Sequence, residues 1–193
     1  MKPSFYTFII ALFLIPFSLF AQTDHLKFKG VPIDGTLNQF VYKMQSAGFT
    51  KIGQDGKAVI LKGDFAGYKD CYIIVSTLDN KDLVNQIAVK FSSHNNWRTL
   101  ENNYQNLKAM LTKKYGEPFD IIEEFQGKYV DDDTDRFYEL KADRCIFRTE
   151  WQTELGRIVL TLGHELLEGG FVLLGYIDKT NDAIIEQTAL DDL

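Results

Sequence analysis

The stretch from Asn96 to Pro118 places the strongest constraint on the fold, because it has the spacing of one amphipathic helix with both ends marked. Large apolar side chains recur every three or four residues, which puts them on one helical face: Trp97, Leu100, Tyr104, Leu107, Leu111 and Tyr115. Asn95 or Asn96 can cap the first turn, and Gly116 followed by Pro118 ends the helix. A helix of this length is marginal alone in water, so the apolar stripe predicts burial in a core rather than a ligand groove.

Residues 1–21 have the pattern of a secretory signal peptide, and we leave them out of the fold. One lysine precedes an uncharged apolar run from Phe5 to Phe20, and the small Ala21 precedes a polar start. Leu19 is larger than the residue usual three positions before a cleavage site, so an uncleaved anchor is the alternative. The sequence therefore predicts an exported protein, periplasmic or secreted, that is free of the membrane once cleaved.

The mature part, residues 22–193, is acidic, which disfavours two classes of partner. The chain has 21 basic and 27 acidic residues, and removal of Lys2 leaves 20 against 27, a net charge of −7. Such a surface repels nucleic acid and anionic lipid. A chain of this size forms one domain or two small fused units, and it buries enough surface to fold without a metal or a disulfide. We expect no cofactor.

Cys71 and Cys145 are the only cysteines, and both lie in the exported part. In an oxidising compartment the two can pair, and the chain-entropy model gives a loop of that length about 4.5 kcal/mol of stabilisation. The other interpretation is two small buried residues that never meet, because sequence spacing does not supply the distance between their Cα atoms.

Helix and strand signals follow one another in two similar halves. Thr36 and Gln39 form a capping box at the start of an earlier helix, which Gly48 ends. Strands are predicted at 58–62, 69–77, 83–91, 119–125, 145–153, 158–164 and 171–177, and further helices at 136–142 and 181–190. Alternation of apolar and polar residues indicates an antiparallel sheet with one wet face. The expected fold is a single α+β domain, residues 22–193, of two helix-plus-antiparallel-sheet halves, 22–94 and 95–193.

Internal duplication is one explanation of the two halves, and chance similarity among apolar strands is the other. Residues 65–68 resemble residues 125–129, and a cysteine precedes a long strand in each half. If the repeat is real, two sheets join edge to edge with both helices on one side. This order resembles the tandem architecture of the β-lactamase-inhibitor protein, although no motif residue supports the likeness.

Three segments carry a resemblance to a family of proteins: residues 28–36 (FKGVPIDGT), 114–118 (KYGEP) and 176–178 (YID). They resemble a group of small, uncharacterised exported proteins of Gram-negative anaerobes, and the likeness spans most of the mature chain. The resemblance implies no activity, because none is established for that group.

Asp131, Asp133 and Asp135 alternate like the first ligands of a calcium loop. An EF-hand requires glycine and glutamate where this chain has Arg136 and Ala142, so only a looser calcium site is a candidate. A solvated acidic loop is the alternative interpretation.

Residues typical of a hydrolase are sparse. The segment His164–Glu168 lacks the second histidine of a zinc hydrolase, and the glycines around it indicate a turn between strands. No Gly-x-Ser-x-Gly motif is present, and His25 and His94 lie far from His164 in the sequence. Several aromatic residues could line a sheet face as a stacking platform for sugar or peptide, with ordinary core pairing as the alternative: Tyr68, Tyr72, Tyr129, Tyr138 and Trp151.

The sequence therefore predicts a non-catalytic binding or scaffold protein of the periplasm. It would engage another envelope protein, a peptide or a glycan through a sheet face or edge. One alternative is a hydrolase of cell-envelope polymers, polysaccharide or peptide, which titratable groups converging in a cleft would support. The other is a periplasmic protein inhibitor, which a concave apolar sheet face rimmed by polar groups would support.

Overall fold

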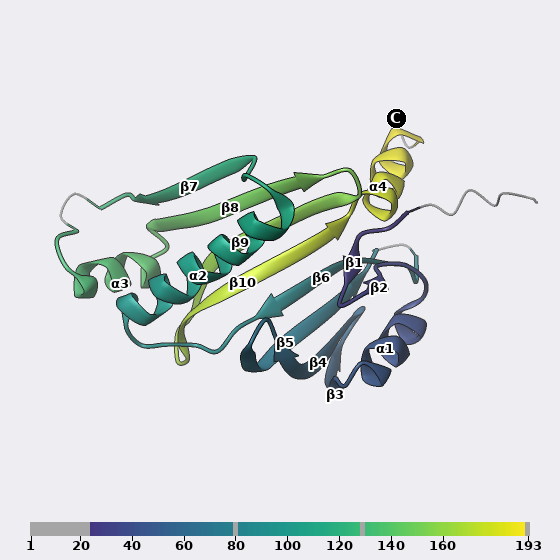
Figure 1. Cartoon of the computed structure of the whole chain (residues 1–193), viewed down its shortest axis with the longest axis horizontal. Coiled ribbons are helices and arrows are strands. Elements are labelled where there is room, and N and C mark those ends of the chain that lie inside the picture. The colour runs from purple at the N-terminus through teal and green to yellow at the C-terminus, as the bar shows by residue number, and fades with distance from the viewer. Residues whose placement is uncertain (1–23, 79–80, 128–129, 192–193) are drawn as a thin grey trace, which may run out of the picture.

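The structure is a computed structural model that describes residues 24–78, 81–127 and 130–191 (Figure 1). Within these ranges the chain has the predicted α+β fold, with four helices, an antiparallel sheet of eight strands and a small hairpin. The expected signal peptide lies outside the described residues. No helix among the described residues is long and apolar enough to cross a membrane.

The elements follow one another in the order helix, strands, helix, strands. The helices are α1 (Leu37–Ser46), α2 (Trp97–Tyr115), α3 (Asp133–Lys141) and α4 (Lys179–Asp191). The hairpin consists of β1 (Lys27–Phe28) and β2 (Val31–Pro32). The large sheet consists of β3 (Thr50–Asp55), β4 (Ala58–Phe65), β5 (Tyr68–Thr77), β6 (Val84–Lys90), β7 (Asp120–Phe125), β8 (Cys145–Thr153), β9 (Gly156–Glu165) and β10 (Gly169–Asp178).

The strand order in the large sheet is β3-β4-β5-β6-β10-β9-β8-β7. Each half of the chain therefore contributes four neighbouring strands, with its first strand at an outer edge and its last strand in the middle. The two central strands pair antiparallel, with Lys90 opposite Leu173 and Gln86 opposite Ile177. One continuous sheet thus spans both halves.

The helix α2 is the element that the spacing predicted. The Asn96 side chain accepts a hydrogen bond from the Thr99 N–H at its start, and Gly116, with a φ of 88°, follows its last residue. The predicted stripe is core: five of its six members are buried, and Tyr115 packs against them half-buried. Inside the core, the Tyr104 hydroxyl lies 2.7 Å from the Thr149 hydroxyl on β8.

The helix α1 packs over the first half of the sheet. Thr36 accepts from the Gln39 N–H and Gln39 accepts from the Thr36 N–H, which confirms the predicted capping box. The buried face of α1 belongs to the same hydrophobic cluster as that of α2, and the buried side chains of β5 and β10 lie in it too. Both helices therefore cover one side of the sheet.

Differences from the sequence prediction lie at the edges and ends of elements. The edge strand β3 was missed, because a strand that is exposed on both sides shows no alternation of apolar and polar residues. The helix α3 starts three residues earlier than expected, because the Asp132 carboxylate accepts hydrogen bonds from the N–H groups of Thr134 and Asp135 and so caps it. The strand β8 has the predicted bounds.

A buried polar cluster ties the start of the described chain to its end. The Asp178 carboxylate accepts from the Leu26 N–H at 2.7 Å and from the Asn181 N–H at 2.9 Å, and lies 3.1 Å from His25 Nδ1. The Asn181 amide donates in turn to the Ile33 carbonyl at 3.0 Å and the Val84 carbonyl at 2.9 Å. Residues 24–33 are thereby fastened to β6, β10 and α4.

Candidate functional site

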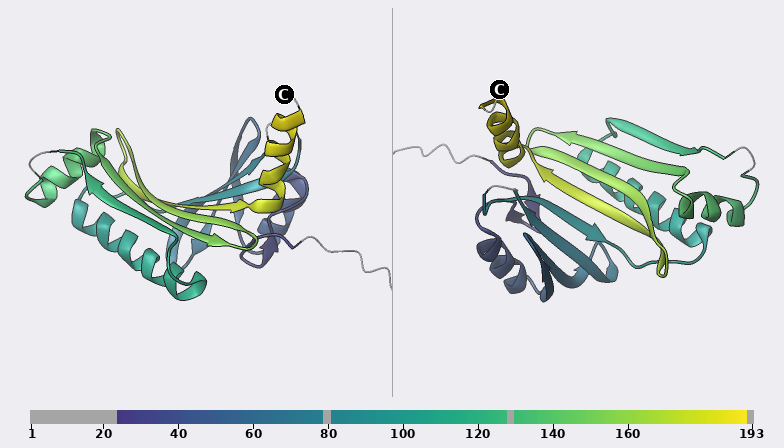
Figure 2. Two further views of the ribbon diagram at one scale, coloured as in Figure 1. Left: turned by 90° about the horizontal axis from the view of Figure 1, so that it is seen from above. Right: turned by 180° about the vertical axis from the view of Figure 1, so that it is seen from behind.

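In the part of the chain that the structure describes, no helix crosses the middle of one side of the large sheet, and we call this side the open face. Figure 2 shows the sheet bent into a trough with α2 along its outer side; seen from behind, β8, β9 and β10 lie in front of α2 with no helix over them. Burial follows the same division. On β10, Val172, Leu174 and Tyr176 are buried on the helix side, whereas Leu173 and Gly175 are only half-buried on the open face.

The floor of the open face is a row of mostly apolar residues. Directly paired residues of an antiparallel sheet share a face, so the strand register defines its rows. The central row crosses six strands: Ile60, Ile74, Ala88, Gly175, Val159 and Glu150. All but the last are apolar and half-buried. The residues with the smallest side chains, Ala88 and Gly175, stand on the two central strands.

Ion pairs border this floor on two sides. Beside the turn between β9 and β10, Lys62 pairs with Asp70 at 2.9 Å, and Lys90 pairs with Glu165 and Glu168. On the side of β7 and β8, a network joins two arginines and three carboxylates: Arg148 with Glu150 and Asp120, and Arg157 with Glu150 and Asp182. The open face is thus a concave apolar floor with charged borders.

The open face is large enough for a protein interface. Seven strand spacings of about 4.8 Å make it about 34 Å wide, and the ten residues of β10 make it about 34 Å long. That footprint, about 1,100 Å², exceeds the roughly 800 Å² that each partner buries in a standard interface. The free edges are less suited to binding. The edge strand β3 carries a register irregularity between Lys51 and Gly53, and β7 carries three carboxylates.

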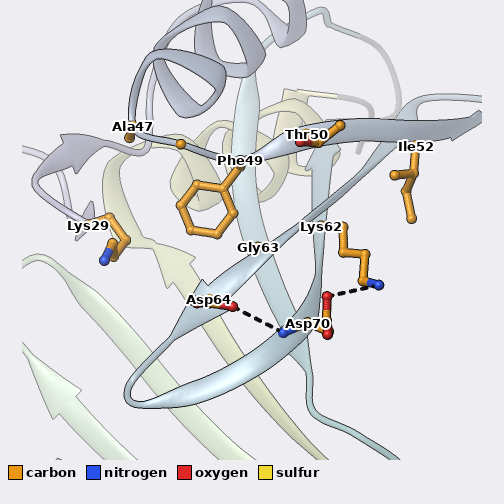
Figure 3. A pocket seen from close by; sticks show the side chains of 10 residues that line it. Lys29, Ala47, Phe49, Thr50, Ile52, Lys62, Gly63, Asp64 and Asp70 are labelled. Carbon is orange, nitrogen blue, oxygen red and sulfur yellow. Dashed lines mark hydrogen bonds and ion pairs between the residues drawn. The ribbon is translucent and has the colours of Figure 1, made fainter.

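A depression of about 620 Å³ lies beside the β3 edge, and Figure 3 draws the side chains that line it. Phe49 packs against Gly63, where a Cβ atom would come within 2.5 Å of its ring. Two charged groups that line the depression have a paired partner: Asp70 raises the pKa of Lys62, and Lys69 lowers the pKa of Asp64. Both groups stay charged at neutral pH, so neither is poised as a general acid or base.

The three histidines do not converge. His94 and His164 lie on either side of Gly170 in the sheet, so two strand spacings, about 10 Å, separate their backbones. Both residues are on the side of the sheet that α2 and α3 cover. His94 contacts Asn103 and His164 contacts Asp143, each at 3.0 Å. His25 lies beside Asp178, eight residues along β10 from Gly170 and so about 27 Å away. The segment His164–Glu168 contains the predicted turn: His164 and Glu165 end β9, and residues 166–168 form the turn before β10.

The calcium candidates Asp131, Asp133 and Asp135 lie at the start of α3 and have separate partners. Asp133 lies 3.3 Å from Arg98 and 3.6 Å from Arg136, and Asp135 accepts from the Asp131 N–H. Among the described residues, no group of three or more histidine, cysteine or acidic side chains is arranged to hold a metal. The calcium site stays a prediction, and an unchanged thermal midpoint in millimolar calcium would refute it.

The two cysteines are not brought together, so the predicted pairing of Cys71 with Cys145 does not occur in this structure. They lie on β5 and β8, four strand spacings and so about 19 Å apart, whereas a disulfide requires Cα atoms within about 7 Å. Burial raises the pKa of Cys71, and raises that of Cys145 to about 12. Neither thiol is a ready nucleophile.

The aromatic platform is not formed as one surface. Trp151 is buried on the helix side, Tyr68 packs edge-on against Phe91, and Tyr138 is exposed on α3. Only Tyr72 presents its side chain on the open face, opposite Lys90, and Tyr129 lies outside the described residues.

The alternation in the sequence predicted a solvent-facing side of the sheet, but not the composition of the open face. Its rows combine strands from both halves, and a pairing of β6 with β10 has no local signal. No family model, curated protein or solved structure matches this chain.

Proposed function

We propose that this chain is an exported, non-catalytic binding protein that engages another envelope protein, a peptide or a glycan through the open face. The observation that carries the proposal is the half-buried apolar floor from Ile60 to Val159, which no helix of the described residues covers. Apolar side chains that stay partly exposed in the middle of a sheet face are a candidate interaction site. The apolar run at residues 5–20 and the polar start after Ala21 support export.

Site-specific photo-crosslinking in the native cells tests this function. A photoreactive phenylalanine replaces Thr161, which stands next to Leu173 on the open face. The control carries the same residue at Asn106, on the exposed side of α2. We expect a discrete adduct from position 161 and none from position 106. Equal labelling from the two positions, or none from position 161, would refute binding through the open face.

A periplasmic inhibitor is a second candidate, because a concave apolar sheet face with charged borders is a shape that can cover an enzyme's active-site rim. If the crosslinked partner is an enzyme, addition of the purified chain is expected to reduce its activity. An Ala88→Arg variant, which places a long charged side chain in the middle of the open face, should then fail to inhibit. A hydrolase finds less support, since both carboxylates that line the depression at the β3 edge are paired with lysines.

We further infer that the two halves arose by duplication and that the architecture resembles the tandem fold of the β-lactamase-inhibitor protein. The order helix, then four strands from the edge to the middle of the sheet, occurs twice, with α3 as an addition to the second half. A relative whose halves resemble each other more closely in sequence would support this origin. A relative with only one half and a different partner for its last strand would oppose it.

A further inference from the structure

Two neighbouring leucines stand at the tip of the turn between β9 and β10. Leu166 is 83% exposed and Leu167 is 97% exposed, more than any other large apolar side chain among the described residues. An exposed leucine contributes no burial to the fold. The pair is therefore available for contact with another molecule.

An ammonium group braces this tip. Lys90 Nζ lies 2.6 Å from Glu165 Oε1 and 3.1 Å from Glu168 Oε2, so it holds the residues on either side of the two leucines. The same atom lies 4.7 Å from the centre of the Phe171 ring. Burial alone would lower the pKa of Lys90, but its bonds to the two glutamates outweigh burial and raise that pKa. The brace is thus charged at neutral pH.

The base of the turn is also held. Gly169 has a φ of 93°, and a Cβ atom there would lie 2.4 Å from Asn95 Oδ1 and 2.6 Å from the His94 carbonyl oxygen. Gly170 and His94 exchange backbone hydrogen bonds of 2.9 and 2.7 Å. Because the turn is ordered before binding, little conformational entropy is lost when the leucines engage a partner.

The charge around the tip indicates what kind of partner fits it. Two glutamates and one lysine give the tip a net charge of −1. Residues 95–193 carry 11 basic and 20 acidic residues, a net charge of −9, whereas residues 22–94 carry 9 basic and 7 acidic residues. An anionic lipid surface or a nucleic acid would be repelled from this half. A surface with lysine or arginine side chains would be attracted.

The tip adjoins the open face. Lys90, which braces it, belongs to a row of that face, where it pairs with Tyr72 on one side and Leu173 on the other. The turn precedes β10 and α4 follows it, so the tip stands at the end of the face away from α4 (Figure 1). A molecule that lies across the apolar floor can therefore reach the two leucines.

We propose that Leu166 and Leu167 anchor the interface of the open face, and that the partner is a protein with an apolar socket bordered by basic side chains. This inference rests on the proposed function, and it narrows the partner from protein, peptide or glycan to a protein. The leucines enter the socket while Glu165 and Glu168 face its basic border. An apolar centre with a polar rim is the usual anatomy of a protein interface.

The test uses the partner crosslinked through position 161, purified and titrated calorimetrically with the mature chain. The Leu166→Ser/Leu167→Ser variant is expected to bind at least about a hundredfold more weakly, a loss of about 2.8 kcal/mol, with an unchanged thermal midpoint. Tyr42→Ser is the matched control: Tyr42 is 72% exposed on α1, and its replacement should leave affinity unchanged. Higher salt should weaken wild-type binding, because the basic border faces two glutamates.

Each contrary result has a separate meaning. If the double serine variant binds within about threefold of the wild type, the leucines are not the anchor, although the proposed function stands because position 161 still crosslinks. Salt-independent binding would refute the basic border. Sedimentation of the wild type with phosphatidylcholine–phosphatidylglycerol vesicles, lost in the double serine variant, would show a lipid partner and overturn the inference. Absence of any adduct from position 161 would refute the proposed function as well.

Discussion

Replacement of Asp178 with alanine is expected to release the N-terminal segment and to destabilise the whole fold. The carboxylate is fully buried and accepts hydrogen bonds from the N–H groups of Leu26 and Asn181. Without it both N–H groups are buried with no acceptor, which costs about 1–3 kcal/mol for each group. We expect the free energy of unfolding to fall by about 2–6 kcal/mol and the thermal midpoint by about 4–24 °C.

Urea titration and calorimetry measure the loss, and a neighbour on α4 supplies the control. Asp182 is 39% exposed and lies 3.8 Å from Arg157, so Asp182→Ala should cost less than about 1 kcal/mol. Asp178→Asn keeps one carbonyl acceptor but turns an NH₂ group towards a backbone N–H. Its loss of unfolding free energy should therefore lie between those of Asp182→Ala and Asp178→Ala. Amide exchange should quicken at Ile33, whose N–H donates to the Leu26 carbonyl.

A small effect would refute the reasoning. If Asp178→Ala unfolds within about 1 kcal/mol of the wild type, or costs no more than Asp182→Ala, then the buried polar cluster does not hold the two ends of the chain together. Destabilisation without faster exchange at Ile33 would show that the loss arises elsewhere in the core.

Three further predictions concern the core. Leu107→Asp should lower the free energy of unfolding by at least about 3 kcal/mol and remove amide protection from both halves together; loss confined to the second half would contradict a shared core. Thr149→Val should lower the free energy of unfolding by about 1–3 kcal/mol, because it leaves the Tyr104 hydroxyl unpaired. In a double-mutant cycle with Tyr104→Phe, the double variant should lose less stability than the two single variants together. Additive losses would mean that the hydrogen bond is not made. Burial raises the pKa of Cys145 to about 12, so the protonated thiol stabilises the fold fully below pH 9, and this contribution is lost as the pH rises from 9 to 12. Thermal melts under reducing conditions should show a smaller alkaline decline for Cys145→Ala, and an identical decline would contradict the burial argument.

The helices were predictable because their signals are local. Caps, terminators and apolar spacing act within one or two turns, so Thr36, Asn96 and Gly116 mark helix ends in the sequence as they do in the structure. The strand β8 was equally readable, since alternation and bounding turns act over a few residues. The edge strand β3 was not, because its six residues are mostly exposed on both sides and so carry no period.

The candidate site depended on long-range pairing. Each row of the open face joins residues from both halves, such as Ala88 with Gly175, and only the pairing of β6 with β10 brings them together. The separation of Cys71 from Cys145 has the same origin. The sequence shows where both cysteines lie in the chain, but only the strand order shows that four strand spacings separate them.

The sequence by itself determined the class of the fold, the ends of its two main helices, the acidic charge of residues 22–193 and the turn that carries Leu166 and Leu167. Tertiary structure decided which strands meet, which side of the sheet the helices leave open, and where the ends of the described chain are fastened. The physical reason is range: helix caps, turns and alternation depend on neighbours in sequence, whereas sheet register and burial depend on free-energy differences among contacts between residues far apart in the chain.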